Sequence, residues 1–124
     1  MVNSVLLYAG AGLTALWGIA HLFPTRSVVE GFGNISADNK RIMAMEWIVE
    51  GVALIFIGVL VSVVTLLDPS SAVSRAVYLT GSGGLVVLAV VSLFTGFRVK
   101  FLPFKLCPLI FTASAILIIL GGYL

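Results

Sequence analysis

Residues 42–67 read IMAMEWIVEGVALIFIGVLVSVVTLL, an apolar run interrupted by two glutamates, Glu46 and Glu50. A helix needs about 20 consecutive apolar residues to cross a bilayer, and this run exceeds that length. Placing an ionised carboxylate at the centre of a membrane helix costs roughly 2.5–3.5 kcal/mol on insertion scales. The two glutamates therefore predict a functional site that faces the interior of a helical bundle.

The composition predicts an integral membrane protein. Of the 124 residues, 60% are hydrophobic and only 10% are charged, and the mean hydropathy is +1.21. A soluble core of this size cannot hide so much apolar surface, whereas a bilayer accepts it. Four apolar stretches are long enough to span, at about residues 4–23, 42–67, 73–97 and 103–123. We expect a single all-α domain, an integral membrane four-helix bundle.

The basic residues predict how the bundle lies in the membrane. With four spans, one side of the membrane holds six of the seven basic residues: Arg26, Lys40, Arg41, Arg98, Lys100 and Lys105. Because cytoplasmic loops carry an excess of Lys and Arg, we expect this side in the cytoplasm and both termini outside it. No basic stripe is present that would favour nucleic acid. The expected partner is the membrane.

The connection between the first two predicted helices, Pro24 to Lys40, has a mixed pattern. Val28 and Phe32 recur at near-helical spacing among polar residues, and Gly31 interrupts the pattern. This favours a short interfacial segment, which is either a membrane-surface linker or a lid over the cytoplasmic mouth of the bundle. The start of the second predicted helix has Ser36 and Asp38 as candidate caps.

Polar and aromatic residues gather on two helix faces. On the first helix one face carries Gly10, Thr14, Trp17 and His21, and on the second Met43, Glu46, Trp47, Glu50 and Leu54 share a face. Counting along the two helices from the cytoplasmic side places His21 at a depth similar to that of Glu46. Arg98 lies near the right level to pair with a carboxylate, and Asn39 lies at the rim.

These residue types indicate acid–base chemistry. Two carboxylates and a histidine in a low dielectric can share a proton, so one group can act as acid and another as base. We assign the catalytic roles to His21, Glu46 and Glu50, and tryptophan faces beside them can stabilise a cation. Ligand contacts are expected from Trp17, Trp47, Met43, Asn39 and Arg98. The three titratable residues do not form the Glu-x-x-His pattern of carboxylate-bridged metal centres, and we expect neither a metal nor a cofactor.

Each of these residues also has a structural interpretation. Glu46 can form an ion pair with Arg41 or Arg98, and His21 can be an interfacial residue near a helix end. The two tryptophans can be ordinary anchors at the membrane interface.

Two motifs carry a resemblance to known families. Trp17-Gly18-Ile19-Ala20-His21, followed by Met45-Glu46 on the next helix, is similar to the emopamil-binding-protein and sigma-2-receptor superfamily. That resemblance implies a membrane pocket for sterols and lipophilic amines, with His21 and Glu46 as the transferable positions. Members of that superfamily are longer, and we assign Glu50 no counterpart in them. The plan of four helices with a long first connection also resembles the small DoxX-like bacterial membrane proteins, which implies a prokaryotic cell membrane.

Three functions follow as hypotheses. The first is a pocket that binds a lipophilic small molecule or lipid and, if catalytic, acts as a membrane-embedded isomerase or hydrolase. The second is a small proton-coupled transporter that works as a homo-oligomer, although the apolar stretch from Val52 to Val61 offers it no polar path. The third is an assembly subunit whose glutamates are neutralised by Arg98 and a neighbouring chain.

Overall fold

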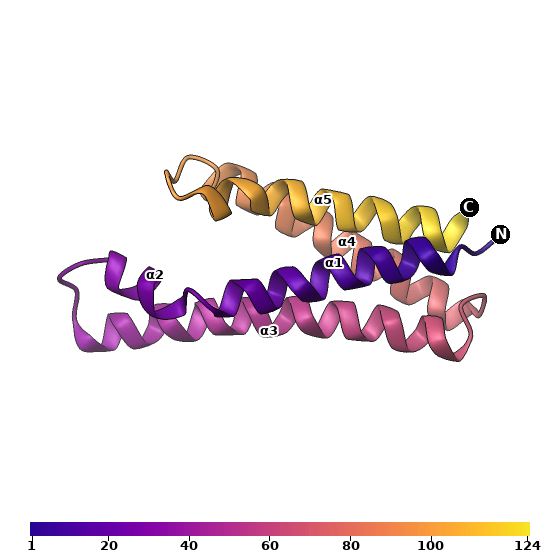
Figure 1. The fold of residues 1–124 in the computed structure, drawn as a ribbon, viewed down its shortest axis with the longest axis horizontal. Coiled ribbons are helices and arrows are strands. Elements are labelled where there is room, and N and C mark those ends of the chain that lie inside the picture. Colours follow the sequence, from indigo (N-terminus) through magenta and orange to yellow (C-terminus); the bar gives the residue numbers. More distant parts are fainter.

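The computed structural model describes all 124 residues and contains only helices (Figure 1). In chain order these are α1 (Ser4–Leu22), α2 (Thr25–Gly31), α3 (Ala37–Leu67), α4 (Ala72–Thr95) and α5 (Leu102–Tyr123). All except α2 are long and apolar enough to cross a membrane. The predictions of an all-α fold and of four such helices are therefore confirmed, and they indicate an integral membrane protein.

The helix starts follow local capping chemistry. Asn3, Ser36 and Ser71 precede α1, α3 and α4, and each side-chain oxygen accepts a hydrogen bond from a backbone amide in the first turn. The cap of α3 is thus Ser36, while Asp38 lies inside the first turn and forms an ion pair with Arg41. Helix α3 begins at Ala37, five residues before the apolar run that was expected to form it. Hydropathy marks only the part of a helix that suits hydrocarbon, whereas the cap determines where the helix begins.

Small residues bring α1 and α3 into close contact. A Cβ atom added to Gly18 would lie 2.7 Å from the carbonyl oxygen of Gly51, and one added to Gly58 would lie 2.5 Å from the carbonyl oxygen of Ala11. The two helices therefore approach each other backbone to backbone, as small residues allow in membrane bundles. Helix α1 also packs against α5, where Gly10 faces Ile118.

Buried positions recur every three or four residues along each long helix. In α1 they are Leu7, Ala11, Thr14, Gly18 and His21, with Gly10 buried in addition where α1 meets α5. In α3 they are Gly51, Leu54, Gly58, Val61 and Thr65. This spacing is the 3.5-residue repeat of left-handed helix bundles. His21 continues the seam of α1, and this position directs its side chain inward.

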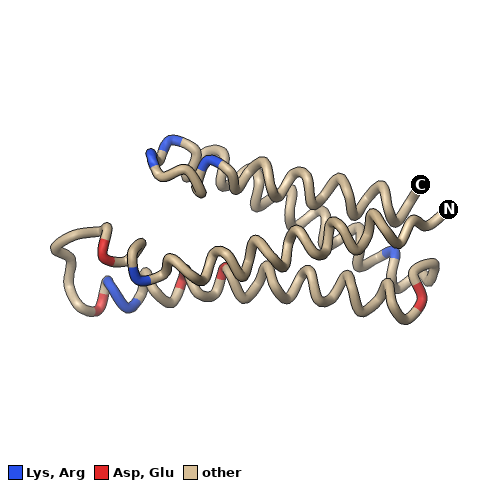
Figure 2. The backbone as a smooth tube through the Cα atoms, in the orientation of Figure 1, with Lys and Arg blue, Asp and Glu red and all other residues tan.

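The four long helices form two pairs that diverge at one end (Figure 1). Helix α1 lies between α3 and α5, and α5 packs on α4, whereas α3 and α4 contact each other far less extensively. Both termini lie at the end where the pairs meet, and the short helix α2 lies at the other end, against α3. Six basic residues gather at that diverging end, which we call the basic end (Figure 2). They are Arg26, Lys40, Arg41, Arg98, Lys100 and Lys105.

The connection from α2 to α3 turns at Gly33, whose φ of +74° lies in the left-handed region. Glycine adopts this conformation without a Cβ clash, which other residues rarely do. The turn folds α2 back toward the bundle, so that its residues reach the space between the two diverging pairs.

Candidate functional site

His21 and Glu50 form the polar centre of the basic end. Nε2 of His21 lies 3.3 Å from Oε2 of Glu50, the His21 side chain is 6% exposed, and the Glu50 side chain is 41% exposed. This distance is within ion-pair range, but the alignment is not that of a hydrogen bond, so Nε2 has no hydrogen-bond partner. A buried ring nitrogen without a partner is unusual, because buried polar groups are nearly always paired.

Trp47 holds the histidine in place. Its indole stacks on the imidazole with ring centroids 3.8 Å apart and an interplanar angle of 15°. The same indole donates a hydrogen bond from Nε1 to the backbone carbonyl oxygen of His21, at 2.6 Å. Phe104 of α5 contacts Trp47 edge-on, with ring centroids 5.5 Å apart. The imidazole is therefore fixed by one aromatic neighbour that also binds its backbone.

The packing register explains why Glu50 pairs with His21. Gly18 packs against Gly51, and α1 and α3 run in opposite directions, so three residues further along α1 the chain reaches the level of Trp47 and Glu50. Glu46 is one helical turn nearer the basic end, where α1 is ending. Its side chain is exposed and forms no ion pair.

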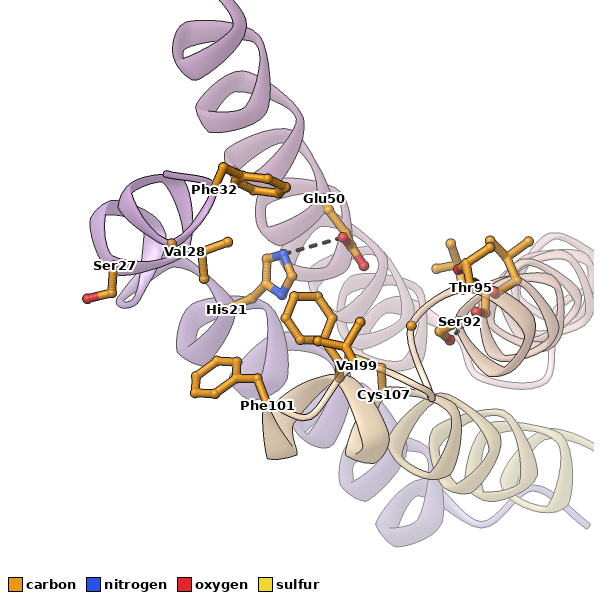
Figure 3. A pocket seen from close by; sticks show the side chains of 15 residues that line it. His21, Ser27, Val28, Phe32, Glu50, Ser92, Thr95, Val99, Phe101 and Cys107 are labelled. Atoms are coloured by element: carbon orange, nitrogen blue, oxygen red, sulfur yellow. Dashed lines mark hydrogen bonds and ion pairs between the residues drawn. The ribbon is translucent and has the colours of Figure 1, made fainter. Parts of the chain in front are cut away.

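The pair opens into a cavity of about 760 Å³ between the diverging helix pairs (Figure 3). All five helices contribute to its wall. Its lining residues are His21, Ser27, Val28, Gly31, Phe32, Glu50, Leu88, Val91, Ser92, Thr95, Gly96, Val99, Phe101, Phe104 and Cys107. The wall is mostly apolar or small, with His21 and Glu50 as its only titratable groups besides the Cys107 thiol.

The hydroxyl groups on the α4 wall donate hydrogen bonds to backbone carbonyls of their own helix. Ser92 donates to the carbonyl oxygen of Leu88, and Thr95 donates to that of Val91. Back-bonding of this kind is common for Ser and Thr in membrane helices. Each hydroxyl oxygen nevertheless keeps lone pairs that can accept a hydrogen bond from a molecule in the cavity.

Several predicted ligand contacts lie outside the cavity. Trp17 is half-buried against the core, and its Nε1 is buried without a hydrogen-bond partner. Met43 is half-buried, and Asn39 is exposed at the start of α3. Arg98 is exposed and forms no ion pair with a carboxylate. The structure thus brings together His21, Glu50 and Trp47 from the predicted set.

Sequence reasoning missed the α4 and α5 walls. Leu88, Val91 and Ser92 carry no distinctive chemistry, and Phe104 looks like any aromatic residue near a membrane interface. Only Val28 of α2 and Phe32, which directly follows α2, gave a signal, through their helical spacing in a polar segment. Helix α2 packs on α3, and both Val28 and Phe32 line the cavity.

Comparison with known proteins found no matching family model, no matching curated protein and no matching solved structure. The resemblances to the emopamil-binding-protein superfamily and to the DoxX-like proteins therefore stay predictions. What the chain can do is argued below from its own cavity.

A histidine and a carboxylate this close can act as acid and base toward one ligand, and their contact can tighten into a hydrogen bond when the ligand binds. The apolar wall of the cavity lowers the local dielectric constant, which strengthens electrostatic interactions beside it. The arrangement suits recognition of one polar group on an otherwise apolar molecule, and proton transfer to or from that group.

Proposed function

We propose that this protein is a membrane-embedded binding protein for a lipophilic small molecule, with His21 and Glu50 as the acid–base pair of the site. The observation that carries the proposal is the cavity of about 760 Å³ next to that pair. Small-molecule sites typically measure about 300–1,000 Å³ and combine an apolar wall with a few polar groups. The reactions that such a pair supports are double-bond migration and epoxide opening, so an isomerase or hydrolase is the enzymatic form of the proposal.

Glu50 has the central role in this proposal, and Glu46 a peripheral one. A partly exposed carboxylate inside an apolar helix is costly unless it interacts with a partner or a ligand. Glu50 has His21 as its partner and faces the cavity, whereas Glu46 lies on α3 level with the end of α1 and does not line this cavity. We therefore assign proton transfer to His21 and Glu50.

The proposed orientation places the cavity on the cytoplasmic side. The basic end carries six of the seven basic residues, and the other end carries Arg75 beside the turn at Asp68 (Figure 2). By the positive-inside rule the basic end faces the cytoplasm, the termini lie outside, and α2 lies at the membrane surface over the cavity mouth. The cell membrane of a prokaryote is the proposed location.

The transporter hypothesis has less support. Beyond Glu50 the next buried positions of α3 are Gly51, Leu54, Gly58 and Val61, none of which can carry a proton further. A proton path from the cavity to the opposite end would need titratable groups or water along this seam. The bundle instead supports a binding site confined to the basic end.

Native mass spectrometry tests the proposal. We would purify the wild type, Glu50→Gln and Glu46→Gln in a mild detergent, incubate each with total lipid extract, and identify the small molecules that stay bound. The wild type and Glu46→Gln should retain the same lipophilic molecule, and Glu50→Gln should lose it. The glutamine keeps the shape of the side chain and removes its charge.

Two outcomes would overturn the proposal. If none of the three proteins takes up a small molecule, the cavity is not a binding site. If all three retain the molecule equally, Glu50 has no part in recognition. Circular dichroism would check that each variant keeps its helices.

A further inference from the structure

The contact between α3 and α4 is tight at one end only. Near the turn at Asp68 the hydroxyl oxygens of Thr65 and Tyr78 lie 3.0 Å apart, and Ser74 donates to the carbonyl oxygen of Val64 at 3.2 Å. Both pairs are buried or partly buried. No other hydrogen bond joins α3 and α4 along their length, and toward the basic end the two helices diverge (Figure 1).

A second hollow lies along the same line of contact, between the tight end and the cavity. It measures about 210 Å³ and is lined by Ile57, Leu60, Val61, Val77, Thr80, Gly81 and Gly84. We call it the glycine groove. A Cβ atom at Gly84 would meet nothing within 4 Å, and one at Gly81 would touch only side-chain atoms of α3, the nearest at 3.8 Å. The groove exists because these two positions carry no side chain.

The groove and the cavity follow one another along both helices. On α3, seven residues separate Glu50 from Ile57 and eleven separate Glu50 from Val61, which is roughly 10–17 Å along the axis. On α4, Leu88 of the cavity lies one helical turn from Gly84 of the groove. The acid–base pair and the glycine groove therefore lie at successive depths of one line between α3 and α4.

The polar groups of the cavity select a particular head group. Neither Lys nor Arg lines the cavity, and Glu50 supplies a carboxylate. Ser92 and Thr95 have donated their protons to their own helix, so toward a ligand they can only accept. A head group with a negative charge would meet repulsion here, whereas one that donates hydrogen bonds finds three acceptors.

Resting on the function proposed above, we propose that the ligand is a single-chain amphiphile. Its head group donates hydrogen bonds beside His21 and Glu50 and carries no negative charge. Its hydrocarbon chain lies between α3 and α4 and reaches the glycine groove. A molecule dissolved in the bilayer reaches this site sideways, through the gap where the two helix pairs diverge.

Gly83 and Gly84 give a matched pair of variants for the test. Both lie in α4, and a Cβ atom at either meets nothing within 4 Å, but only Gly84 lines the groove. The probes are hexadecylamine and octylamine, each with a photoreactive diazirine near the chain end. They would be applied to wild type, Gly84→Leu and Gly83→Leu in lipid nanodiscs, and the labelled peptides identified by mass spectrometry.

The wild type should be labelled by both amines, and hexadecylamine should label the groove segments 57–61 and 77–84. Gly84→Leu fills the groove, so labelling by hexadecylamine should fall at least fivefold while labelling by octylamine stays the same. Gly83→Leu should behave as the wild type. A hexadecylsulfonate probe should label poorly, and Glu50→Gln should remove the preference for amine over sulfonate.

The outcomes separate this inference from the proposed function. One outcome would support the proposed function and overturn this inference: Glu50→Gln reduces amine labelling, but Gly84→Leu changes labelling by hexadecylamine and by octylamine equally. The cavity would then bind the amine, and the glycine groove would not hold its chain. If Gly84→Leu changes only the oligomeric state in native mass spectrometry, the groove is a helix–helix contact and the inference is overturned. If Gly84→Leu does not fold, Gly81→Ala reports on the same groove, and unchanged hexadecylamine labelling in that variant also overturns the inference.

Discussion

His21 and Glu50 approach to 3.3 Å across the α1–α3 contact, although 29 positions separate them in the chain. The approach depends on close helix packing, because the pair lies next to the Gly18–Gly51 contact. Trp47 covers the imidazole on one side, and the cavity lies beside the pair. The site thus combines a ring fixed by packing with a carboxylate that keeps access to a ligand.

Replacing His21 with phenylalanine should separate recognition from folding. Phenylalanine keeps an aromatic ring against Trp47 and keeps the backbone carbonyl that accepts the indole hydrogen bond. Ligand affinity should fall about tenfold or more, since hydrogen bonds to charged groups are worth about 1.5–3 kcal/mol. The measurement is ligand retention by native mass spectrometry alongside a thermal melt. Unchanged retention would remove His21 from the site.

The two tryptophans should respond in opposite ways to substitution by phenylalanine. Trp47→Phe removes the hydrogen bond from Nε1 to the His21 carbonyl and should cost about 1 kcal/mol of stability. Trp17→Phe removes an indole N–H that is buried without a partner, so the loss of that group should cost nothing or stabilise the fold. Denaturant titration in micelles would measure both. Equal destabilisation by the two variants would contradict the assigned hydrogen bonding.

The contact of α1 with α3 should be sensitive to a single methyl group. Gly58→Ala places a Cβ atom 2.5 Å from the carbonyl oxygen of Ala11, a backbone atom that cannot move alone, and should destabilise the protein by about 1–3 kcal/mol. Gly12→Ala is the matched control, because a Cβ atom there meets nothing within 4 Å. Alanine favours a helix over glycine, so the control should be neutral or slightly stabilising. The midpoint of thermal unfolding would show the difference between the two variants.

The number and class of the long helices could be predicted because both depend on local composition. An apolar run of sufficient length identifies a spanning helix whatever it packs against. The first residue of a helix was harder to predict, because α3 begins at the Ser36 cap and includes the polar residues before Ile42. A search for apolar runs leaves such polar residues out, although their backbone is helical.

The pairing within the site depends on register, which is a property of two helices together. Counting from the ends of the apolar runs placed His21 level with Glu46, whereas the contacts of Gly18 with Gly51 and Leu54 place it level with Glu50. The part of the cavity wall formed by α4 could not be predicted from the sequence for a similar reason. Leu88 and Ser92 line the cavity only because α3 and α4 diverge beside them. No sequence pattern in either helix predicts that divergence.

The turn between α3 and α4 should make stability depend on acidic pH through Asp68. Oδ1 of Asp68 accepts hydrogen bonds from the hydroxyl of Ser70 at 2.8 Å and from its backbone N–H at 3.0 Å. These bonds lower the pKa of Asp68 below its ordinary value of 3.8. A lowered carboxyl pKa stabilises the fold above the ordinary value, and this stabilisation is lost as the pH falls through the lowered pKa.

Ser70→Ala tests the hydrogen bond that contributes most. Without the hydroxyl donor, the pKa of Asp68 should rise toward 3.8 and remain below it, because the backbone N–H still donates. The stabilisation lost in acid should then be smaller than in the wild type, and its loss should be complete at a higher pH. Carbon NMR of the side-chain carboxyls measures the pKa directly, with Asp38→Asn to identify the only other aspartate signal. Ser70→Thr keeps a hydroxyl and should titrate as the wild type, whereas an unchanged pKa in Ser70→Ala would show that the hydroxyl does not hold the turn.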